Sequence, residues 1–297
     1  MLTALATIFV LGVLIFFHEL GHFFVAKRVG IKVERFSLGF PPNIFAKKYG
    51  DTTYCIGAIP LGGYVKMAGE NPDDTVSGAP EEFMSKSPWQ RALVILAGPF
   101  MNYVLAIAIL MGVFYFGGAP IYDENQVIVG QLVGDGPAKA AGLEVDDQIL
   151  AIDGQEINHV TEPAPLIKSQ IEKPVQMTVL RGSDTVSLSV TTELKEEPNE
   201  AGGVDSVGLI GVYFLPKTVG YEEYGIGESI SRGFVMAHVI VYRTADFVKQ
   251  LVFGEVSAKM IGGPLFIAQQ SGREARKGPS SLFTFMALLS INLAVLN

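Results

Sequence analysis

The chain has 297 residues, of which 49% are hydrophobic, and it carries a net charge of −8 at pH 7. The acidic balance argues against a nucleic-acid partner, because phosphates attract basic surfaces. The single cysteine, Cys55, excludes an internal disulfide bond and a thiolate metal cluster.

Hydrophobic residues gather in long runs that predict membrane-spanning helices. Residues 2–26 form the first run, and residues 92–116 and 280–297 contain no charge. A bilayer core of about 30 Å needs roughly 20 apolar residues, so each run is a candidate span. Residues 227–253 are a weaker candidate, because they carry Glu228, Arg232, Arg243, Asp246 and Lys249. We expect about four transmembrane helices, the last of them incomplete.

The charge distribution predicts the orientation in the membrane. Residues 27–91 hold nine Lys or Arg, whereas residues 117–231 hold six Lys or Arg against nineteen Asp or Glu. The positive-inside rule places the first segment in the cytoplasm and the second outside, so the N-terminus is expected outside. No Lys or Arg precedes Lys27, which disfavours a cleaved signal peptide.

The first run contains the sequence HELGH at residues 18–22, which places ionisable side chains at membrane depth. On a helix, His18 and His22 lie one turn apart on one face, so both imidazoles can bind one Zn²⁺. Glu19 lies beside them, near enough to take a proton from a metal-bound water. The alternative is a pair of histidines that only hydrogen-bond within a helix bundle. Because ionisable groups are costly in a bilayer, the pattern favours a zinc site.

A catalytic zinc site needs three protein ligands and one open position. The sequence does not reveal the third ligand. His159 lies in the outer acidic segment, and a lone histidine such as His238 is more often a packing residue. Asp246 and Glu255 have no spacing argument in their favour, so the third ligand stays open at this point.

Further motifs resemble those of one protein family. The chain contains IPLGGYVKMAGE at residues 59–70 and AGPFMN at residues 97–102. Residues 254–272 read GEVSAKMIGGPLFIAQQSG, and residues 288–297 read LLSINLAVLN. With HELGH, these motifs resemble the site-2 protease family of intramembrane zinc metalloproteases along the whole chain. The similarity is to its bacterial regulator-of-sigma-E type, in a form with one PDZ domain.

The resemblance implies roles for individual residues. Glu19 would be the catalytic base, and His18 and His22 would bind Zn²⁺. The family's third ligand is an aspartate in a Leu-Asp-Gly motif that follows an asparagine. Asn297 matches this asparagine, so we expect the aspartate beyond residue 297 and an inactive, truncated 297-residue chain. The implied substrate-binding residues are Gly62, Gly63, Tyr64, Asn102, Asn292 and Asn297. For Asn292, packing between helices is an alternative of nearly equal weight.

Residues 54–67 mix β-branched and aromatic residues with a Gly-Gly turn signal, which predicts a β-hairpin. By the resemblance, this hairpin would dip into the membrane beside the active site. A substrate segment must lose its helix before a peptide bond is attacked, and an exposed strand edge offers its backbone new partners. A surface hairpin with no substrate role is the alternative.

The outer segment carries the signals of a small α+β domain. Residues 136–157 predict a short helix after Pro137, then a strand and an Asp-Gly turn at residues 153–154. Residues 174–190 predict two strands around a Gly-Ser turn, and residues 193–205 predict an acidic loop. The region of about residues 126–200 resembles a bacterial-type PDZ domain. Such a domain could bind a peptide end by strand addition or act as a size filter, and the sequence leaves both open.

We therefore expect a polytopic α-helical membrane protein with a membrane-associated β-hairpin and one extracytoplasmic PDZ domain. The expected segments are a first span with HELGH (1–26), a cytoplasmic segment with the hairpin (27–91), a second span (92–116), an extracytoplasmic region (117–226), a third span (227–253), a cytoplasmic loop (254–279) and the start of a fourth span (280–297).

The expected function is zinc-dependent cleavage of transmembrane segments of membrane proteins that were already trimmed outside, such as anti-sigma factors or signal-peptide remnants. The chain would be a multi-pass protein of the inner (cytoplasmic) membrane. Its partners would be the lipid bilayer, transmembrane substrates, and a peptide or substrate ectodomain at the PDZ domain. The main alternative is a non-catalytic membrane PDZ scaffold with a regulatory metal. A metal transporter is disfavoured, because only the first span carries a cluster of ligands.

Overall fold

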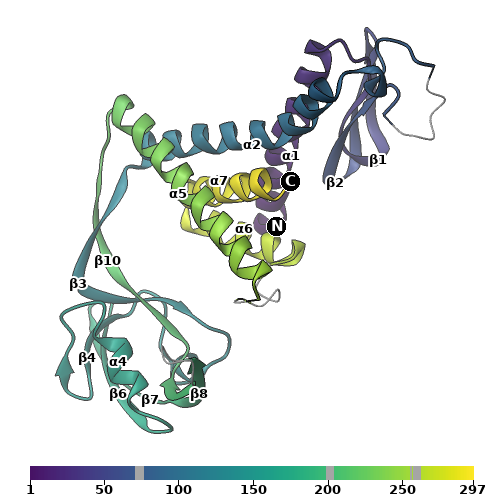
Figure 1. The fold of residues 1–297 in the computed structure, drawn as a ribbon. Coiled ribbons are helices and arrows are strands. Elements are labelled where there is room, and N and C mark those ends of the chain that lie inside the picture. Colours follow the sequence, from purple (N-terminus) through teal and green to yellow (C-terminus); the bar gives the residue numbers. More distant parts are fainter. Residues whose placement is uncertain (71–76, 199–203, 255, 257–261) are drawn as a thin grey trace. The chain divides into compact units, whose positions relative to one another are not determined.

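The structure is a computed structural model that describes residues 1–70, 77–198, 204–254, 256 and 262–297. The chain divides into two compact units (Figure 1). One unit, here called the helical unit, comprises residues Met1–Gly118 and Glu223–Asn297. The other, here called the β domain, comprises Ala119–Glu222.

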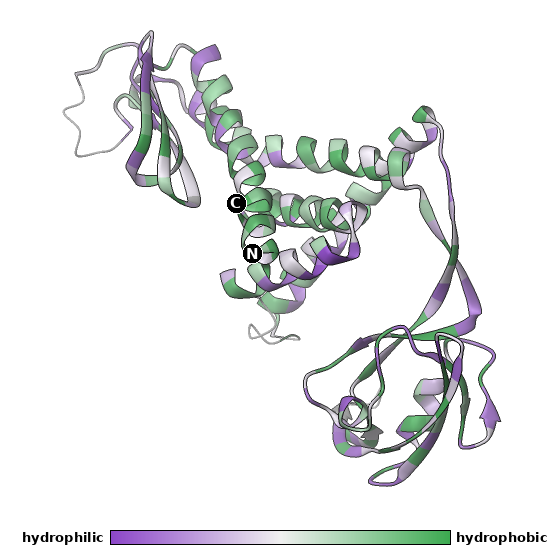
Figure 2. Cartoon of the chain, turned by 180° about the vertical axis from the view of Figure 1, so that it is seen from behind, coloured by the Kyte–Doolittle hydropathy of each residue, from purple (hydrophilic) through white to green (hydrophobic). Residues whose placement is uncertain are grey.

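Helices build the helical unit. They are α1 (Leu2–Arg28), α2 (Pro88–Gly117), α5 (Ile226–Val252), α6 (Pro264–Lys277) and α7 (Pro279–Leu296). Of these, α1, α2 and α7 are mostly hydrophobic (Figure 2). Among the described residues, α1, α2 and α7 are long and apolar enough to cross a membrane. The predicted third span is the helix α5, but it does not meet this criterion. Of the roughly four spans expected, length and composition therefore support three.

Helix α2 is the central helix of this unit, because it packs against α1, α5 and α7. It begins earlier than expected, at a capping box in which Ser87 and Gln90 exchange hydrogen bonds between side chain and backbone. Two apolar clusters hold the helices together. One joins α2, α5 and α7 around Leu110 and Ile291, and the other joins α1, α2 and α7 around Leu14 and Met286.

The predicted hairpin exists, but its position differs from the prediction. Strands β1 (Val33–Tyr49) and β2 (Thr52–Met67) form it, and the chain reverses at Gly50, whose φ is +60°. Residues 54–67 all belong to β2, and the chain reverses again between residues 56 and 63, because residues 53–56 and 63–66 run in opposite directions along residues 35–38. The long hairpin folds over itself, so that residues 35–38 lie between residues 53–56 on one side and 63–66 on the other. The turn was missed because the length of β1 was not recognised.

Aromatic and aliphatic packing fixes the hairpin to the end of α1. Phe23 of α1 makes edge contacts with Phe36 of β1 and Tyr54 of β2. Val33 and Val94 are buried in the same cluster. The first half of the hairpin is therefore rigidly attached to the helix that carries HELGH.

The expected cytoplasmic loop at residues 254–279 contains a helix, α6, which was not predicted. It was missed because Gly262, Gly263 and Pro264 were read as a break in the helix. The buried carboxyl of Glu274 accepts hydrogen bonds from Gln270 and Lys277, and a very short one from Ser281 of α7. Burial opposes ionisation of Glu274, but these donors outweigh it and lower the pKa of the carboxyl. The corner between α6 and α7 is thus fixed by one buried charge.

The β domain has a six-stranded sheet, in which five strands follow the order β10-β3-β4-β6-β7 and β5 pairs with β4. Its strands and helices are β3 (Ala119–Leu132), α3 (Pro137–Ala140), β4 (Gln148–Ile152), β5 (Gln155–Glu156), α4 (Pro163–Lys168), β6 (Pro174–Arg181), β7 (Asp184–Thr191), β8 (Glu193–Pro198), β9 (Val204–Leu209) and β10 (Val212–Glu222). The domain has its own apolar core, which includes Val127, Ile149, Met177 and Val179.

Two turns predicted in the β domain are confirmed, and one predicted loop is wrong. The Gly-Ser turn joins β6 and β7, and the Asp-Gly turn joins β4 and β5, as predicted. The acidic segment at residues 193–205 was predicted as a loop, and this was wrong for its described part. Residues 193–198 form β8, which pairs with β9. The three glutamates of this strand disguised it as a solvated loop.

Candidate metal centre

The helix α1 brings the side chains of HELGH together as the spacing predicted. The Nε2 atoms of His18 and His22 lie 3.2 Å apart, so the two imidazoles converge on one point. Their rings stand at 78° to each other, with centroids 4.8 Å apart. The convergence requires both the one-turn spacing on α1 and a neighbour that shapes the space beside it.

A backbone carbonyl of α2 fixes the orientation of His22. Its Nδ1–H donates a hydrogen bond of 2.7 Å to the carbonyl oxygen of Val94. A carbonyl can only accept, so the proton of the neutral imidazole is on Nδ1 and the lone pair is on Nε2. A second hydrogen bond of this kind commonly holds a metal-binding histidine in the tautomer that exposes its other nitrogen.

The distance between the two Nε2 atoms matches what zinc requires. Two nitrogen ligands about 2.0–2.1 Å from a tetrahedral zinc lie roughly 3.3–3.4 Å apart. The observed 3.2 Å is close to this value. Within the described parts of the chain, no cluster of three His, Cys, Asp or Glu side chains lies close enough to hold a metal. The two imidazoles thus fit two positions of a zinc shell, and a further ligand must come from elsewhere.

Gly98 of α2 provides the space for these imidazoles. A Cβ atom added at Gly98 would lie 2.3 Å from Nε2 of His22 and 2.8 Å from Nε2 of His18. On α1, a Cβ added at Gly21 would lie 2.3 Å from the carbonyl oxygen of Ala97. The two glycines let the helices approach so closely that α2 forms the wall of the site. Sequence reasoning missed this role, although Gly98 is part of the AGPFMN motif.

The hairpin lies beside Glu19. A Cβ atom added at Gly63 of β2 would lie 3.1 Å from Cγ of Glu19 and 2.8 Å from Cγ2 of Ile15. Gly63 is part of the strand segment 63–66, which pairs with residues 35–38. The neighbouring Tyr64 accepts a hydrogen bond from Arg35, and Gly62 faces the ring of Phe40. Of the predicted substrate-binding residues on the hairpin, Gly63 is the one that approaches Glu19.

Asn102 lies on α2 and faces the HELGH helix. Its side chain is 0% exposed, and its Nδ2 lies 3.3 Å from Nδ1 of His18. The motif AGPFMN does not show this burial, so the sequence did not predict it.

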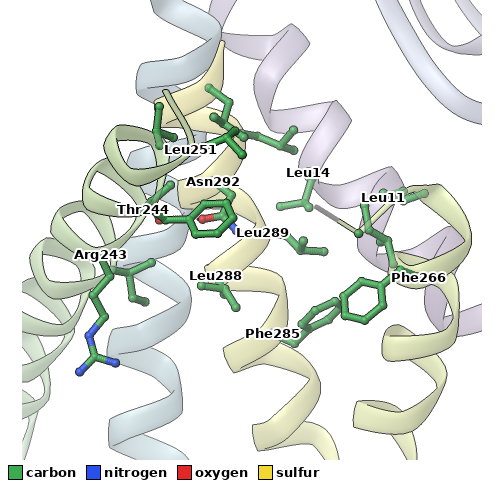
Figure 3. A pocket seen from close by; sticks show the side chains of 17 residues that line it. Leu11, Leu14, Arg243, Thr244, Leu251, Phe266, Phe285, Leu288, Leu289 and Asn292 are labelled. Atoms are coloured by element: carbon green, nitrogen blue, oxygen red, sulfur yellow. The ribbon is translucent and has the colours of Figure 1, made fainter. Parts of the chain in front are cut away.

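Asn292 lines a separate cavity of about 580 Å³ between α1, α5, α6 and α7 (Figure 3). Its Oδ1 accepts a hydrogen bond of 2.8 Å from Thr244 of α5. This contact matches the alternative of packing between helices. Asn297 ends the last helix, and its side chain is exposed.

The low-ranked candidates for the third ligand have other partners. His159 bonds to Glu124 and Thr161 within the β domain. His238 donates to the carbonyl of Phe234. Asp246 accepts from Gln250. Glu255 lies outside the described residues.

Comparison with known proteins decides the family. The model of peptidase family M50 matches residues 6–297. The chain belongs to peptidase family M50. A Clostridium perfringens protein named as a zinc metalloprotease is 37% identical over 285 residues, which cover 96% of this chain and 79% of that protein.

A second relative is the "Regulator of sigma-W protease RasP" of Bacillus subtilis, which is 29% identical over 373 residues. The match covers 99% of this chain and 85% of that protein. A Rhizobium meliloti protein, also named as a zinc metalloprotease, is 33% identical over 307 residues, covering 98% of this chain and 80% of that protein. The predicted resemblance to site-2 metalloproteases is therefore confirmed.

Proposed function

We propose that this protein is a zinc-dependent endopeptidase that cleaves substrates within the membrane. One observation carries the proposal: two imidazoles on an apolar helix converge at 3.2 Å, and a carboxylate follows the first of them. Such a cluster in a membrane-spanning helix needs a function to balance its cost. Membership of the M50 family supports the same chemistry.

The roles of the residues follow from their chemistry. Bound zinc would supply a Lewis acid that polarises the scissile carbonyl and activates a water molecule. His18 and His22 would hold the ion through their Nε2 atoms. Glu19 would take a proton from the attacking water and then give it to the leaving amine. The third ligand would be an aspartate, as the family resemblance implies.

The edge of the hairpin would present the substrate to the metal centre. Residues 63–66 pair with β1 on one side, and no described strand pairs with them on the other. An unwound substrate segment that pairs with this edge would gain backbone hydrogen bonds and reach the neighbourhood of Glu19 through Gly63. Substrates would then be transmembrane segments that unwind locally, as expected for membrane proteins already trimmed outside.

We also propose the orientation that the charges favour. Residues 27–91 would lie in the cytoplasm and the β domain outside the inner membrane, with α5 as a further span that neighbouring helices shield. The β domain would be the PDZ domain, acting as a size filter or a peptide-binding module. In a Cys55→Ser background, an outside reagent should label a cysteine at Ser183 but not one at Lys47. The reverse pattern would refute the orientation.

Glu19→Gln separates an enzyme from the alternative, a PDZ scaffold with a regulatory metal. The amide keeps the shape of the side chain but cannot accept the proton. Zinc should stay bound while cleavage of a transmembrane substrate falls by several orders of magnitude, because general-base catalysis alone contributes about 10²–10⁴-fold. The control is Glu34→Gln, which removes an exposed carboxylate bonded to Lys66 on the hairpin. Unchanged cleavage by Glu19→Gln with zinc bound would remove Glu19 from this role.

A further inference from the structure

The buried amide of Asn102 has a single hydrogen-bond partner in the described part of the chain. Its Nδ2 lies 3.3 Å from Nδ1 of His18, and its Oδ1 is buried with no partner. A buried polar atom without a partner costs about 1–3 kcal/mol, so its presence needs an explanation. The backbone at this position is firmly held, because Ser290 of α7 donates a bond of 2.7 Å to the carbonyl of Asn102.

The direction of the hydrogen bonds in this network follows from the carbonyl of Val94, which can only accept, and from the amide nitrogen of Asn102, which can only donate. The carbonyl of Val94 accepts from Nδ1–H of His22, so Nε2 of His22 is an acceptor. His18 then donates through Nε2–H across the 3.2 Å separation, which leaves its Nδ1 as an acceptor. The amide nitrogen of Asn102 donates to that Nδ1, and its oxygen is left unpaired.

Zinc binding requires a different direction at His18. Both Nε2 atoms must offer a lone pair to the ion, so the proton of His18 must be on Nδ1. That Nδ1–H needs an acceptor, and the group facing it is the amide of Asn102. A turn of 180° about the last bond of the side chain exchanges the amide oxygen and nitrogen within nearly the same volume. His22 needs no change, because Val94 already holds it in the ligating tautomer.

We propose that Asn102 is a positioning residue for the zinc ligand His18. Its amide oxygen accepts from Nδ1–H of His18 when zinc is bound, and its amide nitrogen donates to Nδ1 when zinc is removed. Rotating the amide gains no hydrogen bond, because the nitrogen then lacks a partner in place of the oxygen. The metal–nitrogen bonds therefore supply the free energy, and the amide follows the proton of His18. This inference rests on the proposed zinc site.

Asparagine is suited to this role because one side chain offers both a donor and an acceptor. A carboxylate could bond only to the zinc-bound form of His18, and an apolar side chain could bond to neither form. Two variants of nearly equal size separate these cases: Asn102→Asp keeps the acceptor, and Asn102→Leu removes it. Ser229→Ala is a matched control, because Ser229 of α5 carries the other buried oxygen without a partner.

The zinc dissociation constant, measured by competition with a chelator, gives the first test. Loss of a supporting hydrogen bond to a metal-binding histidine weakens zinc binding by about 10–100-fold, so we expect this for Asn102→Leu. Asn102→Asp and Ser229→Ala should bind zinc as the unchanged protein does or more tightly. A purely structural role would affect Asp and Leu alike, so rescue by aspartate supports the proposal. Equal binding by all variants, or equal loss in Asp and Leu, would overturn it.

Nitrogen-15 spectra of histidine-labelled protein give a second test that needs no activity. In a His159→Gln and His238→Gln background, only His18 and His22 of the four histidines remain. Addition of zinc should move the proton of His18 from Nε2 to Nδ1, while that of His22 stays on Nδ1. A His18 proton already on Nδ1 in zinc-free protein would overturn the proposal. If the unchanged protein binds no zinc at all, the proposed function fails, and this outcome is distinct from failure of the Asn102 inference.

Discussion

The buried polar groups around Asp147 of the β domain and around His18 of the helical unit are paired in opposite ways. In the β domain, the carboxylate of Asp147 is 1% exposed and accepts hydrogen bonds from Arg181 and from the backbone N–H of Glu144. In the helical unit, His18 and His22 turn their nitrogens toward each other, and Asn102 keeps an unpaired oxygen. Among the described residues, both buried side-chain atoms without a partner belong to helices of this unit.

The difference distinguishes a structural polar group from a functional one. A structural carboxylate finds all its partners within its own domain, so nothing else is needed to complete it. Burial opposes ionisation of Asp147, but Arg181 and the N–H of Glu144 outweigh it and lower the pKa of the carboxyl. The histidines, in contrast, present two nitrogens at the spacing of ligands on one ion. The converging nitrogens, rather than incomplete pairing alone, are therefore the sign of a site that binds an ion.

The largest effect should come from Gly98→Ala. The new methyl group would lie 2.3 Å from Nε2 of His22, so the imidazoles could not converge. We expect zinc affinity to fall by more than about 100-fold, beyond the range for supporting residues. The control is Gly112→Ala on the same helix, where nothing lies within 4 Å of the added atom. Equal zinc binding by the two variants, measured by chelator competition, would contradict the geometry of the site.

A smaller effect is expected in the β domain from Asp147→Asn. The change removes the charge that binds Arg181 and should lower the free energy of unfolding of this domain by about 2–3 kcal/mol, the scale of hydrogen bonds to a charged group. Hydrogen exchange of the β6 amides measures it in the whole chain. Asp135→Asn, which affects an exposed carboxylate bonded to Lys139, should leave exchange unchanged. Neither change should alter the zinc affinity. An altered zinc affinity would contradict the distinction between the two units.

The packing of α1 on α2 should be sensitive to Gly21→Ala. A methyl group there would lie 2.3 Å from the carbonyl oxygen of Ala97, and overpacking of this kind costs about 1–3 kcal/mol. Gly12→Ala on the same helix is the control, because its added atom meets nothing within 4 Å. Thermal unfolding in detergent compares them. If Gly21→Ala is as stable as Gly12→Ala, the close approach of the helices is wrong.

The smallest effect is the acid sensitivity of the β domain. The pKa of Asp147 is lowered in the folded state, so its stabilising contribution is present above the unfolded value of about 3.9. The contribution disappears as the pH falls below that value through the folded pKa. Stability of the unchanged domain should therefore drop more steeply below about pH 4 than that of Asp147→Asn. Parallel curves for the two proteins would show that Asp147 does not titrate in this way.

Local periodicity allowed part of the site to be predicted. The one-turn spacing of His18 and His22 places them on one helix face whatever the rest of the fold does, and the charge-free runs marked α1, α2 and α7. The turns at residues 153–154 and 182–183 could also be read, because glycine allows the positive φ that each turn uses.

Features that depend on neighbouring segments could not be predicted. The carbonyl of Val94 and the space at Gly98 become part of the site only when α2 packs on α1, and no pattern in residues 92–98 indicates this. The burial of Asn102 is of the same kind. The register of the long hairpin was missed because it depends on residues 35–38 lying between two parts of β2.

Zinc affinity of single histidine variants tests the central claim most directly. The chain has four histidines, so His18→Ala, His22→Ala, His159→Ala and His238→Ala form a complete set. Chelator competition should show that loss of either imidazole in HELGH abolishes the zinc binding of the unchanged protein. The variants at His159 and His238 should bind as the unchanged protein does. Retention of full zinc affinity by both His18→Ala and His22→Ala would contradict the account, because the converging imidazoles would then not be the metal centre.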